Sequence, residues 1–355
     1  MLPRIVQIVK RFGPVGGMES YVWRLIHGLC ERDLLVSVVC EQVMGKASPS
    51  IDVIQVEKSA EKPRWKSMRQ YRERVDALLR DRFQGQKIII HSHERSISHQ
   101  VTTFHGPPIN ALGNLNWIRK LSPRIRGWMQ MERHELLSPG VQCIIPVSSQ
   151  VQDALISEYS ALKGKHIQLG WPGAESVAEH KVRNSCSKVS ARFIFVGKEW
   201  KRKGLRRAID VVAALRTTNL NVTLDVYGVD PSVVPKLMCK KAGVRFMGWS
   251  SEIPWANYDV LIHPAENEPF GMVVAEARAH GVAVLMSDRV GAADLAWNNV
   301  RIVPIDAPMS EWEVASQELL ESPDSDKLSE VKWTWDDLVD LHCQTIYPNL
   351  EPEIL

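Results

Sequence analysis

Two carboxylates, Glu268 and Glu276, stand eight residues apart in the segment Asp-Val-Leu-Ile-His-Pro-Ala-Glu-Asn-Glu-Pro-Phe-Gly-Met-Val-Val-Ala-Glu. The apolar run 259–263 predicts a buried parallel strand, and a small-residue helix is expected over 271–280. Glu268 is therefore expected at the carboxyl end of a strand, where ligands bind in open α/β sheets. Carboxylates there can accept hydrogen bonds from sugar hydroxyls, and the helix N-terminus between them favours an anion such as phosphate. The competing interpretation is a solvated helix with two surface acids.

A basic segment, 195–205, joins a predicted strand to a predicted helix in the second half of the chain. Gly197 permits close approach of the backbone, and Arg202 and Lys203 stand just before Gly204 at the helix start. Arg binds phosphate oxygens in a bidentate fork and Lys acts as a point charge, so the pair suits a leaving diphosphate on which charge builds. A solvated basic turn is the alternative. The segment has neither a G-x-G-x-x-G fingerprint nor a Walker A sequence, which disfavours nicotinamide and ATP chemistry.

Two weaker signals follow predicted strands of the first half. Gly16 and Gly17 can point backbone N–H groups at a phosphate, although an ordinary turn explains them equally well. His105 is expected at the carboxyl edge of a strand, with a purely structural histidine as the alternative. His91 and His93 have no third ligand at metal spacing, so we expect no metal site there.

The remaining polar motifs indicate neither a metal nor another cofactor. Asp324 and Asp326 have the D-x-D form that holds a metal–nucleotide in one class of sugar transferases, but their Ser/Pro-rich surroundings predict a solvated loop. The six cysteines are scattered without a C-x-x-C, which favours reduced thiols in a cytoplasmic protein.

The segment 116–133 interleaves aromatic and methionine residues with basic ones. This composition suits an anionic membrane surface, where Trp lies at the interface. The alternative is an amphipathic helix packed on its own domain. The residues expected at a membrane or acceptor surface are Trp117, Arg119, Lys120, Arg124, Arg126 and Trp128.

The length of 355 residues suits two domains, and the composition, with 45% hydrophobic and 24% charged residues, is that of a globular protein. We expect neither a membrane-spanning segment nor a signal peptide. The first 180 residues hold 24 Lys and Arg against 17 Asp and Glu, whereas the rest hold 20 against 24. The first half should therefore meet something anionic, but no nucleic-acid-binding signature accompanies the charge, so we expect no nucleic-acid partner.

Alternating strands and helices predict parallel sheets with right-handed crossovers in both halves. We expect two Rossmann-like domains, at 1–175 and 176–334, whose sheets face a cleft that holds the active site, and a C-terminal helix and tail at 335–355 that packs back on the first domain. Strands are expected at 5–9, 35–40, 53–56, 87–91, 100–104, 143–147, 192–196, 222–227, 260–263, 282–286 and 302–303, and helices at 19–31, 66–83 and 335–347 among others.

Taken together, these segments resemble the family 4 retaining glycosyltransferases of GT-B fold over nearly the whole chain. The Trp200-x-Arg-Lys-Gly-Leu form and the basic segment after His105 are most similar to the lipopolysaccharide-core glycosyltransferases of Gram-negative bacteria. The matching pieces are Gly16-Gly17, His105-Gly106, Val196-Gly197, Arg202-Lys203-Gly204, the strand from Asp259 to Pro264, Glu268, Glu276, Ser287-Asp288 with Gly291, and Trp335-Asp336-Asp337.

The resemblance implies a nucleoside-diphosphate sugar donor, with a UDP-sugar favoured, held mainly by the second domain. It implies a saccharide or glycolipid acceptor held by the first domain. The family commonly has Arg directly after the Val-Gly pair, where this chain has Lys198, so the principal diphosphate role falls to either Lys198 or Arg202. The expected donor-binding residues are Gly16, Gly17, Gly197, Lys198, Arg202, Lys203, Glu268, Phe270, Gly271, Met272 and Glu276.

The resemblance also implies individual roles. Arg202, Lys203 and the Gly16 and Gly17 amides would bind the diphosphate. Glu276 would bond the ribose hydroxyls and Glu268 the donor sugar, while His105 would lie near the anomeric centre or the β-phosphate. The residues expected to be catalytic are His105, Arg202, Lys203 and Glu268.

These expectations describe a retaining, metal-independent hexosyltransferase of lipopolysaccharide-core or other cell-envelope glycan synthesis. It is expected in the cytoplasm, peripheral at the inner face of the cytoplasmic membrane, with an anionic membrane surface as partner. A nucleotide-sugar epimerase of GT-B fold and a non-catalytic sugar-nucleotide-binding protein are the alternatives. Release of free UDP only when acceptor is present separates the transferase from the epimerase, and the intact cations and carboxylates disfavour a non-catalytic protein.

Overall fold

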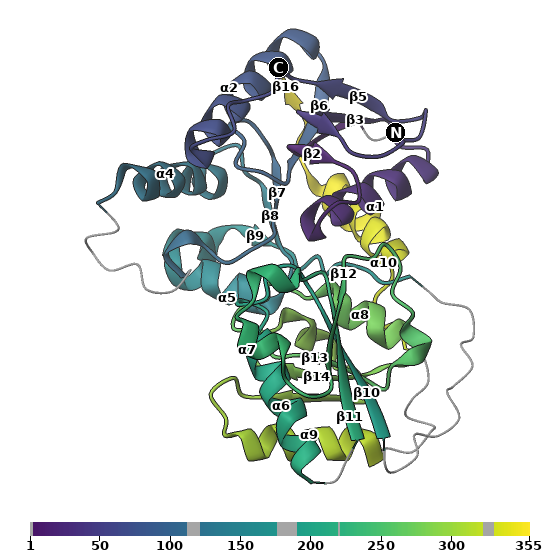
Figure 1. The fold of residues 1–355 in the computed structure, drawn as a ribbon. Coiled ribbons are helices and arrows are strands. Elements are labelled where there is room, and N and C mark those ends of the chain that lie inside the picture. The colour runs from purple at the N-terminus through teal and green to yellow at the C-terminus, as the bar shows by residue number, and fades with distance from the viewer. Residues whose placement is uncertain (1–2, 112–120, 176–189, 219–220, 322–329) are drawn as a thin grey trace. The chain divides into compact units, whose positions relative to one another are not determined.

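The computed structural model describes residues 3–111, 121–175, 190–218, 221–321 and 330–355. The chain forms two compact units, one from Met1–Gly173 with Trp335–Leu355 and the other from Ala174–Thr334 (Figure 1). Each unit has its own sheet with helices packed on it, and the expected α/β class with two Rossmann-like units is confirmed.

The first unit is built on an eight-stranded sheet. Its strands are β1 (Arg4–Ile8), β3 (Val36–Cys40), β5 (Asp52–Gln55), β6 (Lys87–Ser92), β7 (Val101–Phe104), β8 (Cys143–Pro146), β9 (His166–Ile167) and β16 (Glu353–Ile354); β2 (Arg11–Phe12) pairs separately with β4 (Gln42–Val43). The order is β5-β3-β1-β6-β7-β8-β9, all parallel, and only β16 pairs antiparallel, with β6. The order reverses between β1 and β6, and such a reversal opens a ligand-binding crevice at the carboxyl ends of the strands.

The main helices of the first unit are α1 (Gly17–Glu31), α2 (Arg64–Arg82), α4 (Pro123–Leu137) and α5 (Ser149–Glu158). In α1, apolar residues recur at helical spacing and bury one stripe, which includes Tyr21, Leu25 and Leu29. Proline at the first turn starts α4, since its missing N–H is not needed there. Ser148 caps α5 by accepting a hydrogen bond from the Val151 amide at 3.3 Å.

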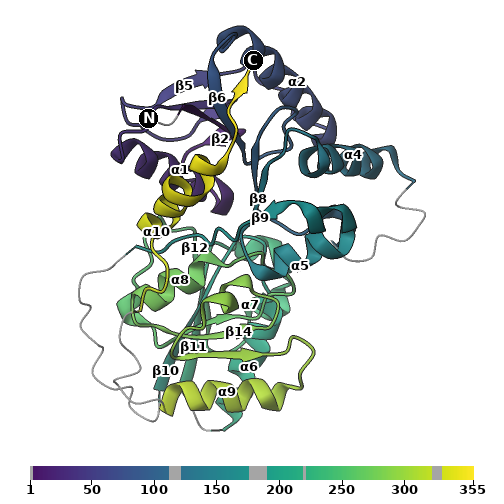
Figure 2. The ribbon, with the colours of Figure 1, turned by 180° about the vertical axis from the view of Figure 1, so that it is seen from behind.

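The C-terminal segment returns to the first unit, and the yellow ribbon runs beside α1 to end at β6 (Figures 1 and 2). It begins with α10 (Trp335–Asp340), continues as a π-helix (Leu341–Ile346) and a short 3-10 turn (Tyr347–Asn349), and ends in β16. Arg32 directly follows α1, and its Nε lies 2.7 Å from Asp340 Oδ1, which fastens α10 to the end of α1. The sequence predicted one continuous helix over 335–347, whereas the structure changes helix type after Asp340.

The second unit holds a six-stranded, fully parallel sheet. Its strands are β10 (Ser190–Val196), β11 (Asn221–Tyr227), β12 (Val244–Gly248), β13 (Val260–His263), β14 (Ala283–Ser287) and β15 (Val300–Val303). The order β12-β11-β10-β13-β14-β15 is that of a doubly wound nucleotide-binding fold. Its switch point lies between β10 and β13, so the loops that follow these two strands come together.

The helices of the second unit are α6 (Leu205–Thr217), α7 (Lys236–Cys239), α8 (Met272–Ala279) and α9 (Met309–Glu321). α6 packs against α9, and both cover the sheet, while α8 packs on β13 and β14. The core between α6, α9 and the sheet includes Phe193, Phe195, Leu205 and the fully buried Trp312. This rigid base positions the loops at the carboxyl ends of the strands.

Candidate active site

Two loops of the second unit meet at its switch point. The first leaves β10 through Gly197 and enters α6 at Leu205, and the second leaves β13 through Pro264 and enters α8 at Met272. The Glu266 amide donates to the Arg202 carbonyl at 2.8 Å and joins the two loops. This junction brings together Arg202, Lys203 and Glu268, three residues that the sequence predicted for the site.

The side chains of these residues converge on one carboxylate oxygen. Lys203 Nζ lies 2.9 Å and Arg202 Nη1 3.3 Å from Glu268 Oε2. Arg202 also pairs with Glu199 at 2.6 Å and donates to the Asn267 carbonyl. The Glu268 side chain is buried, whereas the Arg202 side chain is 34% exposed.

His263, the last residue of β13, is a site residue that the sequence reasoning missed. Its ring is fully buried, and Nε2 lies 3.4 Å from Glu268 Oε2. At that distance Nε2 makes a long polar contact with the carboxylate rather than a well-aligned hydrogen bond, and Nδ1 has no hydrogen-bond partner among the described residues. The sequence placed His263 at the end of an apolar strand, directly before Pro264. A histidine with a purely structural role can stand at the same position, so this placement did not identify it as a site residue.

The electrostatics of the cluster favour an ionised Glu268. Burial by itself raises the pKa of a carboxyl, but His263, Lys203 and Arg202 outweigh burial and hold the pKa of Glu268 well below its ordinary value. Burial lowers the pKa of His263, so its ring is neutral near pH 7. The site therefore combines one carboxylate with two permanent cations at the edge of a parallel sheet, an arrangement suited to anion and sugar binding.

Two glycines make this packing possible. Gly197 has a φ of 156°, and a Cβ there would stand 2.2 Å from Lys203 Cδ. Gly204 has a φ of 76°, and a Cβ there would stand 1.8 Å from the Pro264 carbonyl oxygen. Any side chain at either position would displace Lys203 or separate the two loops.

The other predicted donor-binding residues of the second unit lie in the same two loops and in α8. Phe270 is buried, and its carbonyl accepts from the Ala292 amide at 2.7 Å. Gly271 precedes α8 and Met272 begins it, while Glu276 is exposed on that helix. Lys198 is exposed at the start of the first loop. It is not one of the two cations that pair with Glu268, which are Arg202 and Lys203.

The glycine turn of the first unit also carries a carboxylate. Gly16 precedes α1, and Gly17 is its exposed first residue. The buried Glu19 pairs with Arg11, and its Oε2 would stand 2.4 Å from a Cβ at position 16. Anion binding by the Gly16 and Gly17 amides stays a prediction, and Glu19 is a nearby acid that the sequence reasoning did not identify.

His105 follows β7 and belongs to a chain of polar side chains. Its Nε2 lies 3.1 Å from His93 Nδ1, and His93 Nε2 lies 2.8 Å from Gln7 Oε1. The Gln7 amide in turn donates to the Tyr347 hydroxyl at 2.9 Å. Burial lowers the pKa of His105 to about 3, so its ring is neutral at pH 7. The polar contact with His93 fixes the orientation of this neutral ring.

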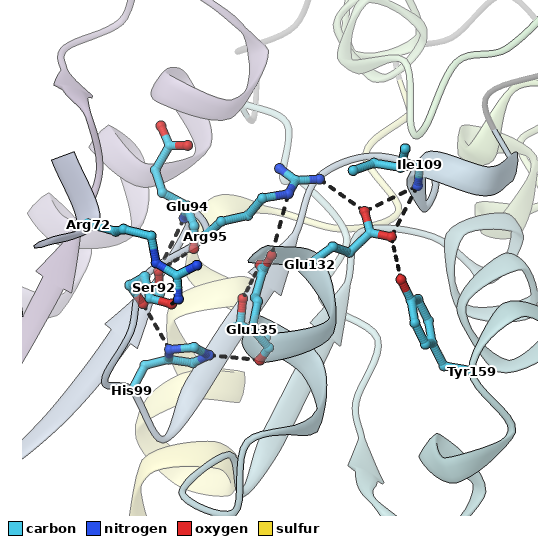
Figure 3. A network of polar contacts seen from close by, with 11 residues as sticks. Arg72, Ser92, Glu94, Arg95, His99, Ile109, Glu132, Glu135 and Tyr159 are labelled. Atoms are coloured by element: carbon cyan, nitrogen blue, oxygen red, sulfur yellow. Dashed lines mark hydrogen bonds and ion pairs between the residues drawn. The ribbon is translucent and has the colours of Figure 1, made fainter. Parts of the chain in front are cut away.

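A buried polar network fastens α4 beside the turn that carries His105 (Figure 3). The Glu132 carboxylate accepts from the Ile109 amide at 3.1 Å and from the Tyr159 hydroxyl at 2.7 Å, and Arg95 Nη2 lies 3.1 Å from Glu132 Oε2. The Thr102 hydroxyl donates a hydrogen bond to Glu135 Oε1 at 2.8 Å. Thr102 and Ile109 flank His105, so α4 is tied to both sides of that turn.

The predicted membrane or acceptor surface is only partly described. Trp117, Arg119 and Lys120 lie outside the described residues. Arg124 and Arg126 are exposed on α4. Trp128 is half-buried, packs against the core of the first unit and carries the Arg95 guanidinium 5.2 Å above its ring, which is the packed arrangement left open by the sequence.

Within 3–111, 121–175, 190–218, 221–321 and 330–355, no cluster of three His, Cys, Asp or Glu side chains is arranged to hold a metal ion. None of the helices in those ranges combines the length and apolarity needed to span a bilayer. Asp324 and Asp326 lie outside the described residues.

Sequence comparison identifies a known domain type in each unit. Residues 15–170 match the family described as Glycosyltransferase Family 4, and residues 190–321 match Glycosyl transferases group 1. The lipopolysaccharide glucosyltransferase WaaG of Escherichia coli (strain K12) is 30% identical over 121 residues, which are 32% of this chain and 32% of WaaG. That alignment therefore spans about a third of its relative.

Structural comparison extends the likeness over the whole fold. The crystal structure of WaaG, a glycosyltransferase involved in lipopolysaccharide biosynthesis, has a TM-score of 0.76 at 17% identity and covers 97% of this chain and 96% of that one. HepE of Anabaena in complex with UDP-glucose has a TM-score of 0.59 at 15% identity, with 97% and 95% covered. These likenesses confirm the expected GT-B fold.

Proposed function

Because the chain belongs to the family 4 glycosyltransferases of GT-B fold and is related to the lipopolysaccharide-core enzymes, we propose a specific reaction for it. It transfers a sugar from a nucleoside diphosphate to a saccharide or glycolipid acceptor, with retention of the anomeric configuration. The observation that carries the proposal is the pairing of Arg202 and Lys203 beside the buried Glu268 at the switch point of a nucleotide-binding sheet.

In the proposed reaction, the bond between the anomeric carbon and the β-phosphate oxygen breaks, and a bond from that carbon to the acceptor oxygen forms on the same face. The acceptor proton passes to the departing phosphate oxygen, so no covalent enzyme intermediate is needed. Arg202 and Lys203 neutralise the charge that develops on the diphosphate. No metal ion is required, because these two cations perform the task that a metal ion performs in other transferases.

The other site residues receive matching roles. Glu268 accepts hydrogen bonds from hydroxyls of the donor sugar, and Glu276 accepts them from the ribose. In the first unit, the α1 amides at Gly16 and Gly17 are assigned to the diphosphate, and His105 to the region of the anomeric carbon. Lys198 is exposed at the start of the same loop as Arg202 and remains the alternative for the main diphosphate contact.

UDP is the favoured nucleotide, supported by the complex of HepE with UDP-glucose. The relationship to WaaG supports an acceptor in the lipopolysaccharide core or another cell-envelope glycan. Such an acceptor would place the enzyme in the cytoplasm, peripheral at the inner face of the membrane, where glycolipid acceptors are assembled. The exposed Arg124 and Arg126 suit anionic headgroups at that surface.

The test is to incubate the protein with UDP-sugars and a panel of truncated lipopolysaccharide-core oligosaccharides. We expect UDP release to depend on acceptor, and proton NMR of the product to show the anomeric configuration of the donor. A product of inverted configuration would contradict retention. Conversion of the donor into its epimer without acceptor would instead identify an epimerase.

A further inference from the structure

Glu268 is paired with Lys203 and Arg202, the two cations that the donor's diphosphate would need. Its Oε2 alone lies within 2.9 Å of Lys203 Nζ, 3.3 Å of Arg202 Nη1 and 3.4 Å of His263 Nε2. Lys203 and Arg202 are the groups assigned to the diphosphate. Both cations are therefore paired with an anion that belongs to the protein itself.

An internal anion has a physical reason to be there. The Lys203 side chain is only 17% exposed, and a poorly hydrated cation without a counter-charge is unfavourable. The Glu268 carboxylate supplies this counter-charge to Lys203 from within the protein. A diphosphate at the same cations would meet a buried carboxylate of like charge, so the two anions cannot both hold Lys203 closely.

The backbone at Glu268 is fixed, so an exchange must occur in the side chain. The Glu268 amide donates to the Arg289 carbonyl at 2.9 Å, and the Gly291 amide donates to the Glu268 carbonyl at 3.0 Å. His263 can become a closer partner of the carboxylate, since its buried Nε2 already lies 3.4 Å from Oε2 without a well-aligned hydrogen bond. A rotated carboxylate that stays near His263 would keep a compensating donor and face the sugar.

We propose that Glu268 is an exchangeable internal anion, which neutralises Lys203 and Arg202 before the donor binds and is replaced at these cations by the donor's diphosphate. The inference rests on the proposed function and adds a role in product release. When the sugar has left, Glu268 returns to Lys203 and competes with the remaining nucleoside diphosphate. The same carboxylate thereby serves the sugar during transfer and speeds release of the product afterwards.

The test is calorimetric titration of UDP, and separately of inorganic diphosphate, into wild type, Glu268→Gln and Glu266→Gln. Glu266 is the matched control, because it is an exposed carboxylate in the same loop and no ion pair joins it to Lys203. Removing the competing charge should make Glu268→Gln bind UDP roughly three- to tenfold tighter, the range expected for a partly screened ion pair. Glu266→Gln should bind like wild type.

Equal or weaker binding of UDP by Glu268→Gln would overturn the exchange while leaving the donor site intact. Equal tightening in Glu266→Gln would also overturn it, because the effect would then be general charge rather than competition at Lys203. If wild type bound neither UDP nor diphosphate, the proposed donor site itself would be wrong. Glu268→Ala replaces Glu268→Gln if the amide variant does not fold, and stopped-flow measurement of UDP dissociation should show slower release in either variant.

Discussion

Lys203 Nζ lies 2.9 Å from Glu268 Oε2, although the two residues belong to different loops of the second unit. The contact exists because β10 and β13 are parallel neighbours at the point where the strand order reverses. It joins the cation proposed for the leaving diphosphate to the carboxylate proposed for the donor sugar. Changes at this pair and around it should separate binding from turnover.

The two carboxylates should affect different steps. Glu276→Ala should weaken UDP binding roughly 10- to 100-fold, because it removes charge-assisted hydrogen bonds to the ribose. Glu268→Ala should bind UDP more tightly than wild type, because the competing charge is gone, and should lower turnover of the intact sugar donor. Calorimetry with UDP and steady-state rates with the sugar donor measure the two effects. An unchanged UDP affinity in Glu276→Ala would remove the ribose assignment.

Activity should survive excess EDTA, since Arg202 and Lys203 supply the positive charge that the diphosphate requires. The measurement compares initial rates of UDP release before and after chelation, with Mg²⁺ or Mn²⁺ added back to a parallel sample. Inactivation by EDTA that either metal reverses would show that the two cations are insufficient and that the reaction depends on a metal ion.

The first unit should dock on anionic lipid through the basic residues in and before α4. Each basic residue near such a surface contributes about 1 kcal/mol, so several must be removed together. Binding should also weaken with salt, because exposed charges are screened beyond about 8–10 Å. The test variant replaces Arg119, Lys120, Arg124 and Arg126 by Ala, and Trp128 is left in place because it packs on its own unit.

Co-sedimentation with liposomes, with and without anionic lipid, measures this docking. A control variant removes four exposed cations of the second unit, Lys201, Lys236, Lys240 and Lys241. The control should bind like wild type, and the test variant should lose most of its binding. Equal binding by test variant and wild type would make the segment ordinary domain surface or acceptor lining, and the membrane assignment would be withdrawn.

Stability should fall as pH drops below about 6.5, the ordinary pKa of histidine. Burial lowers the pKa of His342 to about 4, so the unfolded chain takes up a proton at a pH where the folded protein does not. The stabilisation is complete above pH 6.5 and is lost between pH 6.5 and 4, at up to about 1.4 kcal/mol per pH unit. His342→Leu should flatten the dependence, whereas substitution of the exposed His166 should not. Denaturation curves for wild type and His342→Leu that shift in parallel with pH would contradict this.

Much of the fold followed from local pattern. The long apolar strands and amphipathic helices lie within a few residues of their predicted positions, because burial imposes the same periodicity on sequence and structure. The predicted strand 260–263 has the same bounds as β13. The strands β9 and β16 have two residues each, too few to show a period, and β16 depends on pairing with the distant β6. The edge strand β12 is only partly buried, which weakened its signal.

The site was predictable only where residue type and strand position coincided. Arg202, Lys203 and Glu268 follow predicted strands, and the topology brought their loops together. His263 could not be identified as their neighbour, because that depends on which side of β13 faces the loop. Spacing alone could not rank Lys198 and Arg202 as candidates for the main diphosphate contact, since it does not show that Arg202 pairs with Glu268.

The most direct test of the account is the rate of UDP release by Lys203→Ala, with an acceptor that supports wild-type turnover. Lys203 is the cation that we assign to the leaving diphosphate, and loss of one such group typically costs about 10²–10³ in rate. Lys201→Ala is the matched control, since Lys201 is exposed in the same loop and its ammonium lies over Trp200. Lys203→Ala should lose activity on that scale while thermal denaturation shows a folded protein and Lys201→Ala keeps its rate. A near-normal rate in Lys203→Ala, or an equal loss in Lys201→Ala, would contradict the proposed site.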